Sequence, residues 1–471
     1  MFSRREFIGL GSASLAFAGC GSLTFGADRP KLRLGVMSDI HLTWNVDEPG
    51  SYERIEKMLR YYRERNVDGV VIAGDIADWG FVDQLVQFAE LWRKVFPDDK
   101  APDGHRVERL FVGGNHDLCG PYEPFGWKGR SILEQKDQFI KTVGIDKAWE
   151  KAFGERYESI WLKNVKGYSF TGAHWGREKG LKDFLTANRN KINPHLPYFH
   201  IQHPHPLGTV YRGMFSENSW NYDRGAVFGI LSEFPNAVAL SGHTHVPLTD
   251  ERSIWQGAFT SVATGSLSYV WHLDGRENTN PGGGRVSQMG EINPWPWKDP
   301  DRGHHAMVFE VFDDRIEIER LSAFDLGRLG PNWVVPTDAA RRPYEYRARA
   351  AAFPPPEFPT GAKVTVSAPF AGKDRKGVET EQLDIRFPTA SAGRTRAFDY
   401  EVTAETRTDA GWKPHLVKKV FSPTYHKSVP AEAKEANCVF AVAELPKGPR
   451  RFSVTPLSSF GTRGNTIVSD V

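Results

Sequence analysis

Cysteine is scarce in this sequence, and charge of one sign does not dominate it. Cys20, Cys119 and Cys438 are the only cysteines among 471 residues and form no CxxC pair, which gives no support to a zinc ribbon or a disulfide framework. The 60 Lys and Arg residues are balanced by 58 Asp and Glu residues. The overall charge therefore indicates neither a nucleic acid nor an acidic membrane surface as a partner.

The length of the chain exceeds that of one ordinary domain, so we expect two domains. Hydrophobic residues make up 40% of the sequence and aromatic residues 12%, which is enough to build a substantial core. Fourteen residues are tryptophan. Core packing accounts for most of these, and some are candidates to line a pocket.

The N-terminus lacks an uninterrupted apolar segment suited to a permanent membrane span. Arg4 and Arg5, in the string SRREF, precede a Gly-, Ala- and Ser-rich run. This pattern resembles a twin-arginine signal and predicts an export signal peptide over residues 1–29, which places the protein in the periplasm or cell envelope. Cleavage is expected near residues 25–27. The alternative is lipid attachment at Cys20, which would anchor the protein to a membrane.

The mature chain opens with buried strands that alternate with amphipathic helices. Strands are expected at residues 31–38, 70–73 and 110–112, with helices at 52–65 and 82–95 between them. This order indicates βαβ units and parallel strands. Further strands are expected at residues 168–171, 197–202, 237–240, 259–264, 306–312 and 315–321, and further helices at 131–142, 181–191 and 223–233.

Polar residues that bind metals recur where the expected strands end, which is the edge at which open α/β sheets place their chemistry. Carboxylate, imidazole and amide ligands suit Mn, Fe or Zn better than Cu(I) or clusters. We expect Asp39, His41, Asp75 and His245 to hold one metal ion, and Asp75, Asn115, His203 and His243 to hold a second. Asp75 would bridge the two ions, and a hydroxide between them would attack phosphorus in an in-line displacement.

His116 and Asp117 follow the ligand Asn115. We expect His116 to protonate the leaving oxygen or stabilise the phosphoryl oxygens, with Asp117 or another carboxylate fixing its tautomer. Any one of these histidines alone would be read as structural. His304 and His305 lie outside these strand-end motifs. We expect both to have a structural role, although their loop could reach the pocket.

The blocks Asp-x-His, Gly-Asp, Gly-Asn-His-Asp, a single His block and Gly-His-Thr-His, in this order, resemble the calcineurin-like metallophosphoesterase superfamily. The resemblance covers residues 32–321 and implies an α/β fold of two packed mixed β-sheets flanked by helices, with a dinuclear site. The fourth block usually reads His-x-Pro. Here the string is QHPHP, which contains two histidines. We expect His203 to be the ligand, and His205 is the alternative. The purple acid phosphatase branch has Tyr where this chain has Asp78, so we expect no ferric–tyrosinate centre.

The sequence changes character after the expected catalytic domain, residues 30–330. Residues 331–362 are rich in Pro and Arg and are expected to form a linker. Residues 363–471 read as about seven short strands and predict a small all-β sandwich, whose last hairpin resembles that of fibronectin type III domains. Strands are expected there at residues 363–368, 383–387, 397–403, 416–421, 438–445, 451–456 and 466–471.

The leading hypothesis is an exported metal-dependent phosphoesterase that hydrolyses a small phosphorylated substrate. One alternative is a hydrolase that cleaves the diphosphate of a nucleotide or a lipid-linked substrate. Another is a non-catalytic binding protein of the cell envelope on the same scaffold. The sequence of the β-sandwich contains no recognisable cluster of catalytic or metal-binding residues. We expect this domain to be structural or to contact a partner or a cell-envelope polymer.

Overall fold

The computed structural model of the chain describes residues 29–42, 50–118, 144–215, 222–272, 275–279, 284–285, 303–374, 376–392, 395–428 and 434–470. Residues 1–28 of the expected signal peptide, with Cys20, lie outside these ranges, as does the helix expected over residues 131–142. Among the helices that the structure describes, none combines the length and the apolar character needed to cross a membrane.

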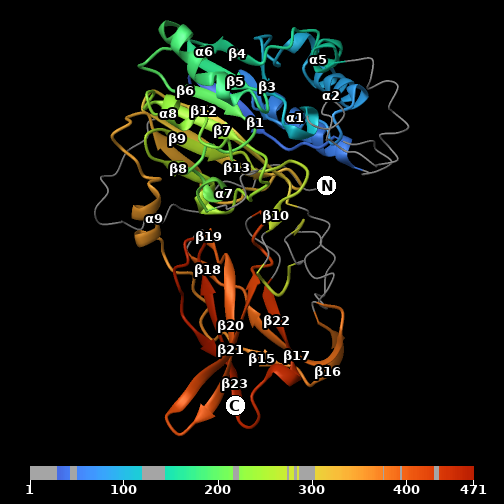
Figure 1. Cartoon of the computed structure of the whole chain (residues 1–471), viewed down its shortest axis with the longest axis vertical. Helices are drawn as coiled ribbons and strands as arrows, with labels where there is room; N and C mark the ends of the chain where they lie inside the picture. Colours follow the sequence, from blue (N-terminus) through green and yellow to red (C-terminus); the bar gives the residue numbers. More distant parts are fainter. Residues whose placement is uncertain are drawn as a thin grey trace, which may run out of the picture.

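The first of two six-stranded sheets has the order β14-β13-β12-β1-β2-β3 (Figure 1). Three strands are parallel, namely β1 (Leu32–Met37), β2 (Gly69–Ala73) and β3 (Glu108–Val112). Three antiparallel strands extend it, namely β12 (His305–Val311), β13 (Arg315–Ser322) and β14 (Trp333–Pro336). The helices α1 (Ser51–Glu64) and α2 (Val82–Val95) connect its parallel strands.

The second sheet has the order β4-β5-β6-β7-β9-β8. Its parallel strands are β5 (Tyr168–Ala173), β6 (Tyr198–Gln202), β7 (Ala237–Ser241) and β9 (Thr260–Ala263). The antiparallel strands β4 (Ile160–Val165) and β8 (Ile254–Gln256) form its two edges. The described helices of this half also include α5 (Ile145–Phe153), α6 (Leu181–Asn188) and α8 (Phe228–Leu231).

The two sheets pack face to face around one apolar core. Val71 and Val112 of the first sheet lie in the same buried cluster as Phe170 and Ile201 of the second. The other face of the first sheet packs on α1 and α2 in a separate cluster. Because both faces are covered, β2 is buried at every position, which explains its uninterrupted apolar sequence. The expected α/β architecture of two mixed sheets flanked by helices is confirmed.

The prediction of a helix over residues 223–233 is wrong, since only the short helix α8 forms within this range. The carboxylate of Asp223 accepts hydrogen bonds from the backbone N–H groups of Leu207, Gly225 and Val227. Arg224 has a left-handed backbone, with φ 59°. A carboxylate that bonds its own neighbouring backbone offers an alternative to the helix, and here a loop results.

The segment expected to be a linker, residues 331–362, contributes structure to the catalytic half. Its strand β14 pairs with β13, and Trp333 is buried with its indole N–H donating to Glu251 Oε2 at 2.9 Å. Arg349, in the helix α9 (Tyr346–Ala352), donates to the same oxygen at 2.7 Å. The catalytic unit of the structure therefore extends beyond Gly330.

The C-terminal region consists of antiparallel sheets (Figure 1, orange to red). One sheet contains β15 (Thr365–Val366), β16 (Phe370–Lys373), β17 (Glu379–Pro388) and β22 (Glu435–Ala441). The other contains β20 (Asp399–Thr408), β21 (Gly411–Phe421), β23 (Arg450–Leu457) and β24 (Ile467–Val468). Ile385 and Val454, from different sheets, share one buried cluster. The expectation of an all-β C-terminal region is confirmed, and its likeness to fibronectin type III stays a prediction.

The catalytic half and the C-terminal sheets meet at an interface with polar and apolar parts. Asn278 donates to the carbonyl oxygen of Phe421 at 3.1 Å and accepts from its N–H at 2.9 Å. Arg276 donates to Asp399 at 3.0 Å. Val270, which is fully buried, packs in one cluster with Phe398, Phe421 and Tyr425. The two parts are thus joined by more than the connecting chain.

Candidate metal centre

The carboxyl ends of five strands bring the predicted ligands to one place. Each ligand lies within four residues of the end of its strand, with Asn115 at the start of the short helix α3 (Asn115–Leu118), so the βαβ connectivity itself assembles the set. These strands and ligands are β1 with Asp39 and His41, β2 with Asp75, β3 with Asn115, β6 with His203, and β7 with His243 and His245. Ligand atoms gather within 4.8 Å of one another in three overlapping groups.

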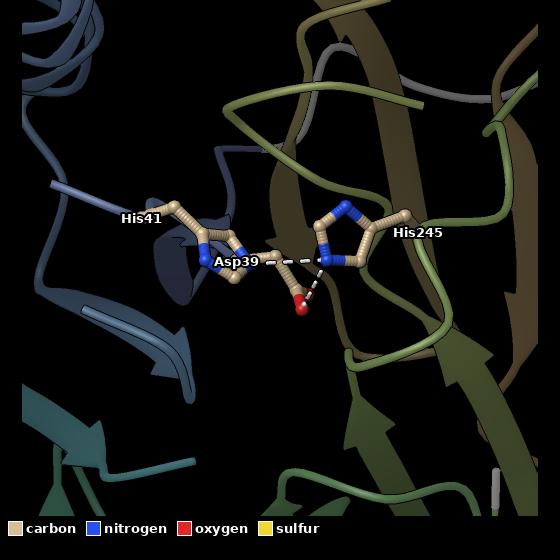
Figure 2. Close-up of side chains that lie close together, drawn as sticks. All are labelled: Asp39, His41 and His245. Atoms are coloured by element: carbon tan, nitrogen blue, oxygen red, sulfur yellow. Dashed lines mark hydrogen bonds and ion pairs between the residues drawn. The ribbon is translucent and has the colours of Figure 1, made fainter. Parts of the chain in front are cut away.

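The first cluster consists of Asp39, His41 and His245 (Figure 2). The Nε2 atoms of the two histidines face each other at 3.1 Å, and His245 Nε2 lies 3.1 Å from Asp39 Oδ1. All three side chains are buried. Three atoms able to coordinate one cation therefore converge out of contact with bulk solvent.

The outer nitrogens of the two rings show why a cation fits between them. His245 Nδ1 donates to the carbonyl oxygen of Tyr269 at 2.9 Å, and His41 Nδ1 lies 2.9 Å from Asp78 Oδ1. Burial, aided by His116, lowers the pKa of His41, which favours the neutral ring that binds a metal ion. A proton on each Nδ1 would leave both Nε2 atoms available to bind one metal ion between the rings.

The second cluster is formed by Asp75, Asn115, His203 and His243. His203 Nε2 lies 3.0 Å from Asp75 Oδ2, 3.1 Å from Asn115 Oδ1 and 3.2 Å from His243 Nδ1. The other nitrogen of His203 donates to the carbonyl oxygen of Ala73 at 2.7 Å. Four inward-facing donor atoms of types that suit Mn, Fe or Zn thus meet in a second buried group.

Asp75 lies between the clusters. Its Oδ2 atom is 3.0 Å from His203 Nε2 and 3.7 Å from His41 Nε2, while Oδ1 accepts the backbone N–H of His116 at 2.9 Å. This is the placement that a carboxylate bridging two ions requires.

The site favours positive charge. Burial opposes ionisation of Asp39, but His245 outweighs it and lowers the pKa of Asp39 to about 2. Burial likewise opposes the charged form of His203, but Asp75 raises the pKa of His203 to about 9. The two ionised carboxylates therefore attract a cation, which a proton or a metal ion can supply.

The backbone of the site is strained. Five predicted ligands have a left-handed backbone, a conformation that costs a residue other than glycine of the order of 1–3 kcal/mol. Such strain persists only where the surroundings impose it, and it gathers at functional sites. The five are Asp39 (φ 48°), His41 (φ 48°), Asp75 (φ 53°), His243 (φ 73°) and His245 (φ 50°).

Two glycines of the motifs are required by the ligands themselves. Gly74 has φ 98°, and a Cβ atom there would lie 2.2 Å from His203 Nδ1. A Cβ atom on Gly114 would lie 2.1 Å from Asp75 Oδ1. The glycines before Asp75 and Asn115 therefore let ligands from distant loops approach the backbone.

His116 lies at the edge of the centre, as predicted, and its ring meets that of His41 edge to face at 4.5 Å. Its Nδ1 donates to the carbonyl oxygen of Asp78 at 2.7 Å and lies 3.8 Å from the carboxylate of Asp78. The side chain is 22% exposed. Nδ1 of His116 is thus held by the loop after β2, and a ring nitrogen of His116 lies within 4.8 Å of ligand atoms of His41 and Asp75.

Asp117 does not have the expected position beside His116. Its buried carboxylate accepts the backbone N–H groups of Ile76 at 3.1 Å, Ala77 at 2.8 Å and Gly114 at 2.8 Å. Burial and the charge of Asp75 raise the pKa of Asp117 to about 7. Asp117 holds the loops after β2 and β3 together, and Asp78 takes the place beside His116 that was foreseen for Asp117 or another carboxylate.

The geometry favours His203 over His205 as a ligand. Both ring nitrogens of His205 are engaged by hydroxyl groups, with Nδ1 2.6 Å from Ser241 Oγ and Nε2 2.6 Å from Thr244 Oγ1. Burial lowers the pKa of His205 to about 3. His304 and His305 are also buried and bond to backbone groups, so both are structural.

Two residues beside the ligands escaped the sequence reasoning. Asp78 orients His41 and His116, and its one sequence signal is its position three residues after Asp75. Tyr269 gives its carbonyl oxygen to His245 and lays its ring 4.3 Å from the ring of His245. No sequence motif marks Tyr269. Its role depends on a contact with His245, which lies 24 residues earlier in the chain.

Comparisons with known proteins found one family model and several solved structures to which parts of this chain are similar. Residues 32–247 match the family model described as calcineurin-like phosphoesterase. Among solved structures, a dimetal phosphatase from Danio rerio shows 10% identity over 66% of this chain and 100% of its own, with a TM-score of 0.39. A purple acid phosphatase from yellow lupin (Lupinus luteus) shows 15% identity over 67% of this chain and 54% of its own, with a TM-score of 0.38. No curated protein matches the sequence.

All seven predicted ligands fall within the range of the family match. Residues 32–247 therefore contain a calcineurin-like phosphoesterase domain, and the clusters of His and Asp within it suit metal ions. The protein is a metal-dependent phosphoric ester hydrolase.

Proposed function

We propose that the protein is exported and hydrolyses a small phosphorylated substrate at a dinuclear metal centre. The observation that carries the proposal is the meeting of two donor clusters at Asp75, one with His41 and one with His203. When bound, two ions of Mn, Fe or Zn would activate water for attack on phosphorus and stabilise charge on the phosphoryl oxygens.

His116 is the proton donor of this scheme. Its Nδ1 proton is committed to the carbonyl oxygen of Asp78, so a proton given to the leaving oxygen has to come from Nε2. Asp39 and Asp75 remain ionised and hold the positive charge of the centre.

The test is a substrate panel on metal-reconstituted protein. Turnover of phosphomonoesters, phosphodiesters and diphosphates is measured on the wild type and on His116→Ala. Metal-dependent hydrolysis of one class that falls in the variant supports the proposal. Preference for diphosphates of nucleotides or lipids would establish the alternative hydrolase. Metal binding without hydrolysis of any class would favour the binding protein and contradict the proposal.

Export is tested through the N-terminus. The twin-arginine pattern motivates Arg4→Lys with Arg5→Lys, which should leave the protein in the cytoplasm. Normal export of the double variant by the same route would contradict the assignment. A Cys20→Ser variant distinguishes membrane anchoring through a lipid from a cleaved signal, because only the lipidated protein would leave the membrane fraction on this change.

The fibronectin type III-like assignment of the C-terminal sheets is also proposed here, with contact to a partner or a cell-envelope polymer as one role. It is supported by the order of short antiparallel strands with a shared core. Retention of the full-length protein on isolated cell wall, compared with an unrelated exported protein, tests this role.

A further inference from the structure

Two segments of the catalytic half connect the first metal cluster to the C-terminal sheets. We name residues 246–249 the proximal segment and residues 266–271 the distal segment. The proximal segment directly follows His245 in the chain. The distal segment carries Tyr269, whose carbonyl oxygen receives the Nδ1 proton of His245. The orientation of this one ligand thus depends on both segments.

The distal segment is hydrogen-bonded along the loop that bears Asp39. The backbone N–H of Leu267 donates to the carbonyl oxygen of Ser38 at 2.9 Å, and that of Ser268 to the carbonyl oxygen of Asp39 at 3.1 Å. At its far end, Trp271 N–H donates to the carbonyl oxygen of His245 at 2.9 Å. The segment therefore spans the backbone of two first-cluster ligands.

The opposite side of the distal segment is embedded in the C-terminal region. Val270 is fully buried in a cluster with Phe398, Phe421 and Tyr425. The hydroxyl of Tyr425 lies 3.5 Å from the carbonyl oxygen of Trp271. These aromatic side chains fix the segment from outside the catalytic half.

The proximal segment is held by the same part of the C-terminal region. Thr249 Oγ1 donates to the carbonyl oxygen of Tyr425. His305 accepts the N–H of Leu248 at Nδ1, at 3.0 Å, and donates from Nε2 to the carbonyl oxygen of His426 at 2.9 Å. Its own N–H donates to Ser266 of the distal segment at 2.7 Å, so His305 joins both segments to residues 421–428.

The second cluster is anchored differently. His203 donates to Ala73 at the end of β2, and Asp75 accepts from the backbone of His116 after β3. These anchors lie on elements of the catalytic half. The first cluster therefore differs in that the orientation of one of its ligands, His245, also depends on segments held by the C-terminal region.

We propose that the C-terminal region is a positioning element for the first metal cluster, because its residues 421–428 and Phe398 hold the proximal and distal segments that bear on His245. Loosening the clamp should weaken binding at Asp39, His41 and His245, and leave the cluster of Asp75, Asn115, His203 and His243 intact. This inference rests on the metal-binding part of the proposed function.

The experiment is a metal titration of full-length variants. Val270→Ala opens the clamp, and Val107→Ala is the control, since Val107 is equally buried but lies before β3 in another core cluster. Each change is made in two backgrounds, Asn115→Ala, which disables the second cluster, and His41→Ala, which disables the first. Affinity for Mn²⁺ is measured by calorimetry, and bound metal by elemental analysis.

Partners of metal-binding histidines typically contribute 10–100-fold to affinity. We expect Val270→Ala to weaken Mn²⁺ binding about tenfold in the Asn115→Ala background and to leave it unchanged in the His41→Ala background. Val107→Ala should change neither. Thr249→Val, which removes one hydrogen bond to Tyr425, should act in the same direction as Val270→Ala.

Unchanged binding in the Asn115→Ala background, or equal losses in both backgrounds, would overturn the positioning role. If Val270→Ala is insoluble, Thr249→Val alone decides by the same criteria. A wild-type chain that binds no Mn²⁺ would instead overturn the proposed metal centre, so the two failures are distinguishable.

Discussion

The strand ends of the catalytic half and the C-terminal sheets differ in backbone conformation and in the residues that they bury. At the strand ends, buried carboxylates and imidazoles lie together on a left-handed backbone. Among the described residues after Gly330, by contrast, every residue with positive φ is a glycine. Residues other than glycine with a left-handed backbone also occur elsewhere in the catalytic half, such as Arg224 and Leu326, but the five at ligand positions gather at the strand ends, as expected where a functional site imposes strain. The following predictions test this contrast in order of decreasing effect.

Asp75→Asn should have the largest effect. It removes the charge of the carboxylate that lies between His41 and His203, and the two ions would then repel each other without the anion that screens them. Bound metal per chain should fall for both sites, and turnover should fall by more than about 10⁴-fold, beyond the loss of a positioned acid. Asn115→Ala is the matched change and should weaken the binding of the second ion only. Retention of both ions by Asp75→Asn would contradict the bridging role.

His116→Ala should retain both ions and lose turnover by about 10²–10⁴-fold, the usual range for a positioned acid or base. Metal content and turnover are measured on the same preparation. Asp78→Asn keeps the carbonyl oxygen that receives Nδ1 of His116 and leaves an amide oxygen that can accept from Nδ1 of His41, so its loss should be smaller. A His116 variant that binds a single ion would make His116 a ligand.

Trp333→Ala tests whether the start of the expected linker belongs to the catalytic half. Trp333 is buried, bonded to Glu251, and covered by the Arg320 guanidinium 4.2 Å from its ring. Its removal should lower the free energy of unfolding by about 3–5 kcal/mol. Trp412 of the C-terminal hairpin, a partly exposed residue beside Arg451, is the control and should cost about 1 kcal/mol or less. Urea denaturation measures both, and equal costs would contradict this boundary.

Glu178→Gln should have the smallest and a pH-dependent effect. Burial raises the pKa of Glu178 to about 7, above its ordinary value of 4.5. The folded chain then holds this proton more tightly than the unfolded chain, and stability falls as pH rises from about 4.5 to about 7. The variant should equal the wild type at pH 4 and exceed it by about 1–3 kcal/mol at pH 8. Urea denaturation at both pH values checks this, and a difference independent of pH would refute it.

The ligands could be read from the sequence because each follows a strand that is itself recognisable. The apolar run before Asp75 and the glycines beside the ligands are local signals, and parallel connectivity then brings them together. β14 was missed because Pro and Arg surround its short apolar core, Trp333–Pro336. The helix expected around Asp223 failed because its carboxylate bonds the backbone of its own loop.

The remaining features depend on contacts between distant parts of the chain. The contact of Tyr269 with His245 and the clamp on Val270 have no periodic pattern and no motif. In the sequence, Asp78 stands out only as the position where a related branch has Tyr. Its bonds to His41 and His116 follow from the path of the loop after β2, which residue types alone do not specify.

The left-handed backbone at five ligand positions has a consequence for folding as a whole. Strain that the apo chain must hold lowers its stability, whereas ions that bind only the folded chain raise it by mass action. At a free concentration one hundred times its dissociation constant, each ion adds about 2.7 kcal/mol. The midpoint temperature of thermal unfolding should therefore rise with metal concentration and fall when a chelator is added. The stability of this protein thus depends on the metal content of its surroundings as well as on its sequence.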